Sequence, residues 1–166
     1  MGMAVVGCRV TLPSPSTPHS RLPTDSHVLE ALAAINWLAV VAATLALYVL
    51  GGLWYSPVLF GPSWRAGVGF VPPGEWKPGK LLYLAPLAGC VVVTVATALL
   101  VTIADAHSAT DGVALGLIVG LGYGAAVAGV DATAPSHPRP GTLAFIVGTY
   151  WTVGLTMVAV ILSAWR

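Results

Sequence analysis

Charged residues are scarce in this sequence. Asp, Glu, Lys and Arg make up 8% of the 166 residues, whereas an average soluble domain contains about 25%. The formal net charge is +1, so the charge balance indicates neither a nucleic-acid partner nor an acidic one. We therefore expect no nucleic acid among the partners of this chain.

Cysteine is also rare, and its two occurrences exclude a disulfide framework. Cys8 lies in a polar leader and Cys90 lies in a long apolar stretch, where we expect it to be a small packing residue. Asp105, His107 and Asp111 share one turn, but three such residues meet in one turn often by chance. We predict no metal site, no cofactor and no catalytic residues.

Long apolar stretches are what the sequence has instead. Four of them cover residues 31–53, 81–104, 112–130 and 143–164, and none contains Asp, Glu, Lys or Arg. A helix needs about 20 apolar residues to cross a hydrocarbon core of about 30 Å. The sequence therefore predicts an all-α integral membrane four-helix bundle whose first partner is the lipid bilayer.

The first 28 residues differ in composition from the rest. Proline alternates there with serine and threonine, at Pro13, Pro15, Pro18 and Pro23. Such a segment cannot bury a core, so we predict a disordered leader over residues 1–28 and a four-span membrane domain over residues 29–166.

The longest loop between spans, residues 56–80, combines aromatic and basic side chains. It contains Phe60, Trp64, Phe70 and Trp76 together with Arg65, Lys77 and Lys80. This mixture is typical of a segment that lies on the membrane interface. An ordinary loop with apolar residues is an equally good interpretation.

The basic residues predict an orientation, because cytoplasmic loops are enriched in Lys and Arg. The first and third loops hold Arg65, Lys77, Lys80 and Arg139, whereas the opposite side has Arg21 and Arg166 near the spans. We expect a multi-pass protein of the bacterial plasma membrane with both termini outside.

The third span carries small residues at a strict spacing of four. They are Gly112, Gly116, Gly120, Gly124 and Ala128. Small residues at this spacing form a groove on one side of a membrane helix, into which another helix backbone fits closely. The groove predicts either packing within the chain or the seam of a homodimer.

Several ring-bearing residues are expected at a similar membrane depth. Counting from the span ends at 1.5 Å per residue, the candidate polar layer contains Tyr48, Tyr123, Tyr150 and Trp151, facing small residues near Cys90 of the second span. A polar pocket or permeation path is one interpretation of this layer. The other is that the rings pack the bundle and bond to backbone carbonyls or threonines.

The sequence from Ile35 to Trp64 contains a dense motif. Ile35-Asn36-Trp37-Leu38 begins it, and its most specific residues are Gly51, Trp54, Tyr55, Ser56, Pro57, Phe60, Gly61 and Trp64. This motif resembles the family called domain of unknown function 1761, small four-span membrane proteins found largely in bacteria. The resemblance implies a membrane location and four helices, and it assigns no activity or site residues.

The sequence therefore favours a non-enzymatic membrane protein that acts through helix packing. It would work as a homodimer or as a subunit beside another membrane protein. The alternative is a subunit of an oligomeric small-solute transporter or channel. Ionisable residues, which are typical of ion-coupled pathways, are absent from all four apolar stretches.

Overall fold

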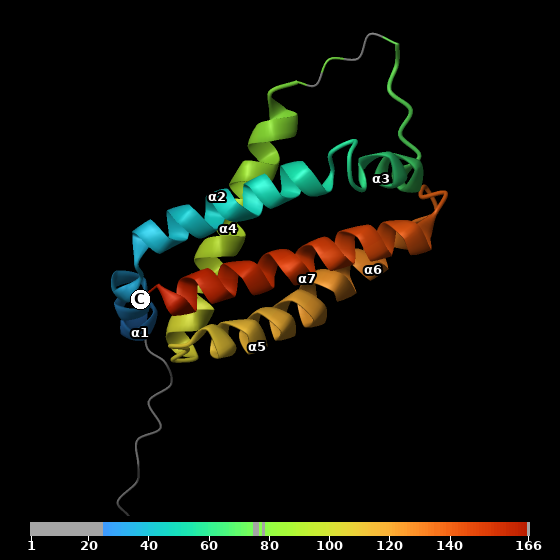
Figure 1. Cartoon of the computed structure of the whole chain (residues 1–166). Helices are drawn as coiled ribbons and strands as arrows, with labels where there is room; N and C mark the ends of the chain where they lie inside the picture. Colours follow the sequence, from blue (N-terminus) through green and yellow to red (C-terminus); the bar gives the residue numbers. More distant parts are fainter. Residues whose placement is uncertain (1–24, 75–76, 78, 166) are drawn as a thin grey trace, which may run out of the picture.

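Every regular element of the described chain is a helix. The computed structural model describes residues 25–74, 77 and 79–165, and Figure 1 shows its arrangement. The elements are α1 (Asp25–Ala34), α2 (Trp37–Trp54), α3 (Gly61–Val68), α4 (Leu81–Ile103), α5 (Ala109–Val119), the π-helical segment η1 (Gly120–Ala125), α6 (Ala126–Ala132) and α7 (Pro140–Ala164).

Part of the predicted leader lies outside the described residues. Residues 1–24 of the leader, which include Cys8, are not among the described residues. Two residues from other parts of the chain, Trp76 and Arg166, also lie outside them. The last four residues assigned to the leader, 25–28, form the beginning of α1.

Four helices are long and apolar enough to cross a membrane, as the sequence predicted. They are α2, α4, the continuous run α5–η1–α6, and α7, with 18, 23, 24 and 25 residues. At 1.5 Å per residue, even the shortest is about 27 Å long. The chain is therefore a multi-pass membrane protein.

The first span is shorter than predicted, since it begins at Trp37 rather than Ala31. Asn36 interrupts the helix with φ −76° and ψ 96°, and its Oδ1 accepts hydrogen bonds from the backbone N–H of Leu38 and Ala39 at 3.1 and 3.2 Å. Asn36 is thus an N-cap. Its Nδ2 donates to the Trp165 carbonyl at 3.2 Å, which ties the start of α2 to the end of α7.

Helix α7 is the centre of the molecule (Figure 1). In its most apolar window 44% of the residues are buried, against 17% in α5–η1–α6. The run α5–η1–α6 lies along one side of α7, while α2 and the steeply crossing α4 contact α7 elsewhere. The bundle is therefore three helical units arranged around a fourth.

The glycine row faces α7 in this structure. A Cβ added at Gly120 would lie 2.8 Å from Thr152 Cα, and one added at Gly124 would lie 2.7 Å from Trp151 Cβ. At Gly112 and Gly116 an added Cβ would likewise collide with the α7 backbone, and Ala128 is buried. Only glycine permits this approach of the two backbones.

Helix α3 lies within residues 56–80, for which the sequence predicts either an interfacial segment or an ordinary loop. Gly67 packs against Leu143 of α7, and α3 ends at Gly69, whose φ of 73° requires glycine. Helix α3 thus rests on the first turns of α7, beside the connection that follows α6 (Figure 1).

Candidate functional site

The motif residues at the end of α2 gather around a single side chain of α7, Tyr150. The Tyr150 ring centroid lies 5.3 Å from that of Tyr55, 6.2 Å from that of Trp54 and 5.2 Å from that of Trp151. Most of these rings meet at steep angles, the arrangement that aromatic quadrupoles favour. We call Trp54, Tyr55, Phe60, Trp64, Tyr150 and Trp151 the aromatic cluster.

Trp54 joins the cluster to the backbone of α7. Its Nε1 donates a hydrogen bond to the Ile146 carbonyl at 3.1 Å, and its ring packs on Phe60 with centroids 5.0 Å apart. A buried indole N–H needs such a partner. Trp54 therefore fixes the end of α2 against α7.

The turn after α2 depends on Gly61. A Cβ at Gly61 would collide with the Tyr55 carbonyl oxygen and would lie 2.6 Å from that of Ser56. The backbone N–H of Phe60 donates to the Trp54 carbonyl, and that of Gly61 to the Ser56 carbonyl, both at 3.0 Å. These bonds fold the motif back so that α3 starts next to the cluster.

Tyr55 follows the last residue of α2 and lies in an edge contact with Trp64, at a centroid distance of 5.6 Å. Burial raises the pKa of Tyr55 to about 12. Its hydroxyl is therefore expected to stay neutral across the physiological range.

The Tyr150 hydroxyl is the polar centre of the cluster. It donates to the Leu47 carbonyl at 3.5 Å and is hydrogen-bonded to the Cys90 thiol. A Cβ added at Gly51 would lie 3.0 Å from this hydroxyl oxygen, so glycine makes room for it. Helices α2, α4 and α7 thus meet at one point, and both polar groups are satisfied there.

The predicted polar layer is brought together only in part. Tyr150 and Trp151 are in contact, whereas the Tyr48 hydroxyl donates separately to the Tyr83 carbonyl at 3.3 Å. Tyr123 is 70% exposed and, within the described part of the chain, makes no ring contact with the cluster, so it is separate from Tyr150. Cys90, expected at the same depth only as a packing residue, is the one that bonds to Tyr150.

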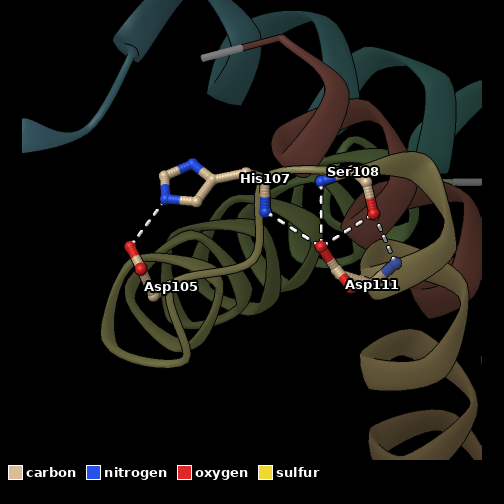
Figure 2. Close-up of polar contacts among 4 residues, drawn as sticks. All are labelled: Asp105, His107, Ser108 and Asp111. Carbon is tan, nitrogen blue, oxygen red and sulfur yellow. Dashed lines mark hydrogen bonds and ion pairs between the residues drawn. The ribbon is translucent and has the colours of Figure 1, made fainter.

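At the other end of the molecule, the polar turn before α5 has a structural task (Figure 2). Asp111 Oδ2 accepts hydrogen bonds from the Ser108 hydroxyl at 2.7 Å and from the backbone N–H of Ser108 and His107 at 3.1 and 3.2 Å. With the Ser108 hydroxyl accepting from the Asp111 N–H, this is a capping box. His107 Nε2 lies 2.7 Å from Asp105 Oδ1.

The arrangement is thus an aromatic core at one end and a helix cap at the other. Among the described residues, no group of three His, Cys, Asp or Glu side chains could hold a metal ion. A small cavity of about 20 Å³ lies near Ile35, Ala39 and Leu162, which is room for about one water. The sequence did not predict the pairing of Tyr150 with Cys90 or the hydrogen bond from Trp54 to the Ile146 carbonyl. Both depend on which face each helix turns toward its neighbours.

A comparison with protein-family models matches residues 38–163 to the model described as protein of unknown function (DUF1761). The match includes the whole motif from Gly51 to Trp64 and extends almost to the end of α7. No curated protein and no solved structure shows significant similarity to this chain.

Proposed function

Since the chain belongs to the DUF1761 family, for which the family model gives no activity, we propose that it is a non-enzymatic component of a membrane assembly in the bacterial plasma membrane. The observation that carries this proposal is the first half of α4. This segment extends away from the other helices (Figure 1).

The two halves of α4 differ in burial. Exposure is 75% at Leu81, 54% at Tyr83 and 58% at Leu84, whereas Thr94 and Val101 are 0% and 2% exposed. Gly89 has no atom within 4 Å of an added Cβ. Apart from the hydrogen bond between the Tyr48 hydroxyl and the Tyr83 carbonyl, the first half of α4 therefore offers large exposed apolar side chains beside an open glycine, a combination that suits a neighbouring helix.

Pro86 adds a reason for a protein neighbour. It lies inside α4 and has no N–H to donate to the Leu82 carbonyl one turn earlier. In a bilayer, a carbonyl freed in this way is best satisfied by a side chain of a neighbouring helix or by water near the surface. We infer that a second membrane protein, or a second copy of this chain, covers this half of α4.

The proposal that the protein is not an enzyme is supported by the structural roles of its polar residues. Asp111 and Ser108 cap α5, and Asp105 pairs with His107 on the exposed turn. Tyr150 and Cys90 bond to each other among aromatic rings. Each of these candidate groups thus has a structural partner.

The orientation is part of the same proposal. Arg65, Lys77, Lys80 and Arg139 lie at the end where α2 and α6 finish, whereas Glu30, Asp105 and Asp111 lie at the opposite end. The positive-inside rule then places the α3 end in the cytoplasm. Both termini would be outside.

Site-directed cross-linking in native membranes tests the assembly. In a Cys8→Ala background, Leu84→Cys is treated with a short bifunctional maleimide, and the product mass is measured. We expect a discrete cross-linked species. Ile118→Cys is the matched control, since Ile118 is 68% exposed on α5. Failure of Leu84→Cys to cross-link, or equal cross-linking at both positions, would contradict the proposal.

Flux through the purified protein in liposomes tests the alternative. A non-transporting component leaves a panel of small solutes at the leak rate of protein-free liposomes. Solute flux that disappears when the Tyr150 region is altered would favour the transporter or channel interpretation instead.

A further inference from the structure

Two arginines that are far apart in the sequence lie at one corner of the molecule. Helix α3 rests on α7 through Gly67 and Leu143, where an added Cβ would lie 3.4 Å from Leu143 Cβ. Beyond it, an added Cβ at Gly69 would lie 3.3 Å from Pro138 Cδ. Arg65 lies four residues before Gly69 and Arg139 lies next to Pro138, so this contact brings the backbones of the two arginines to the same corner.

Neither guanidinium is neutralised within the described chain. No ion pair involves Arg65 or Arg139 among these residues, although Arg65 is half-buried and Arg139 exposed. The nearby His137 Nδ1 is buried and also has no hydrogen-bond partner in the described part. The corner therefore has positive charge and an unused polar atom, none of which has a partner among the residues that the structure describes.

The surroundings of this corner are apolar. Phe70 and Val71, which follow α3, are 37% and 84% exposed, and Phe145 on α7 is 63% exposed. The corner lies at the ends of membrane spans, next to Trp64, whose ring type favours the headgroup level. A ligand that fits both features has an anionic head and an apolar body.

We propose that Arg65 and Arg139 bind the phosphate of an anionic phospholipid headgroup at the end of α7. The guanidinium group matches the oxygens of a phosphodiester with two parallel N–H donors, which a single ammonium group does not provide. Basic sites between membrane helices bind anionic headgroups by this means. The site concerns lipid and is independent of the partner proposed for α4.

The test measures phosphatidylglycerol binding to the full-length protein in detergent micelles, by titration with native mass spectrometry. Arg65→Gln with Arg139→Gln should weaken binding by at least about tenfold, since the double variant removes both cations that would contact the phosphate. Lys80→Gln is the matched control, because Lys80 is an exposed cation at the same end of the molecule but at the N-cap of α4. It should change binding by less than about twofold.

Three further results would overturn the proposal. They are binding of phosphatidylcholine as tight as that of phosphatidylglycerol, equal loss of binding in Lys80→Gln, and unchanged binding in the double variant. Inorganic phosphate that competes at the concentration of the lipid would show a free-anion site and would equally overturn it. Circular dichroism confirms that each variant is folded, and the single Arg139→Gln variant, altered at an exposed side chain, repeats the test with the packing of α3 intact.

Discussion

Two helical units contact α7 in opposite ways. The run α5–η1–α6 lies against it over its whole length, backbone to backbone, through glycines that leave no room for a Cβ. Helix α4 crosses α7, and its buried side chains begin at Cys90 and continue to Val101. In lipid, where apolar surface alone gives helices no reason to associate, close backbone contact holds one unit and local side-chain contacts hold the other.

The largest expected effect is at the glycine contact. Gly116→Leu places a side chain where the Thr156 backbone lies, so we expect a loss of about 3 kcal/mol of unfolding free energy from overpacking. Gly122→Leu on the same helical run is the control, because nothing lies within 4 Å of its added Cβ. Thermal unfolding in detergent compares them, and similar midpoints would show that the row is not a packing surface.

Gly61 tests the turn that brings the motif to α7. Gly61→Ala forces the Tyr55 and Ser56 carbonyls apart, and we expect a cost of about 2 kcal/mol. Gly52→Ala is the control, since Gly52 has open space around it. The measurement is the midpoint of denaturation in mixed micelles, together with the near-UV signal of the aromatic cluster. An unchanged near-UV signal in Gly61→Ala would show that the turn tolerates a side chain.

The two halves of α4 should respond differently to truncation. Val101→Ala removes buried contacts and should cost about 1 kcal/mol. Leu84→Ala alters a side chain that is 58% exposed, and within the monomer it should change stability by less than about 0.5 kcal/mol. Equal effects in a monomeric preparation would mean that the first half of α4 is packed after all.

The smallest expected effect is at the Tyr150 hydroxyl. Tyr150→Phe keeps the ring contacts but removes the bonds to Cys90 and to the Leu47 carbonyl. Hydrogen bonds between membrane helices contribute about 0.6 kcal/mol on average, so a loss of that size is expected in the unfolding midpoint. Tyr123→Phe, at an exposed ring, should be neutral. A large effect at Tyr150 would indicate a role for the hydroxyl beyond packing.

The four spans could be predicted because hydrocarbon thickness fixes their length and composition. The positions at which these apolar stretches depart from a regular α-helix were harder to predict. The predicted first span reaches back to Ala31 because apolar residues lie on both sides of Asn36. Asn36 itself is expected to have a capping or interfacial role, and the structure confirms it as the N-cap of α2. Segment η1 has no sequence pattern of its own, since its glycines serve an α-helix and a π-helix equally.

For the residues of the candidate site, the sequence predicted the membrane depth but not the face of the helix on which each side chain lies. Tyr150 and Tyr123 were placed at one level, yet Tyr150 is buried in the cluster and Tyr123 is 70% exposed. Distance along a helix follows from counting residues, but the face that a residue presents depends on the rotation of the whole helix against its neighbours. The sequence motif includes Trp54 and Tyr55, but it does not reveal that both rings contact Tyr150 of α7.

The π-helical segment explains how the row keeps contact with α7. In an α-helix four residues turn by about 400°, so a row spaced by four drifts by about 40° at each step. Segment η1 turns less per residue than an α-helix. Between Gly120 and Gly124 this smaller turn reduces the drift, so the row of small residues stays on the side that faces α7. Removing one residue from this wide turn should therefore be tolerated far better than removing one from α5, where the deletion swings every later side chain by about 100°.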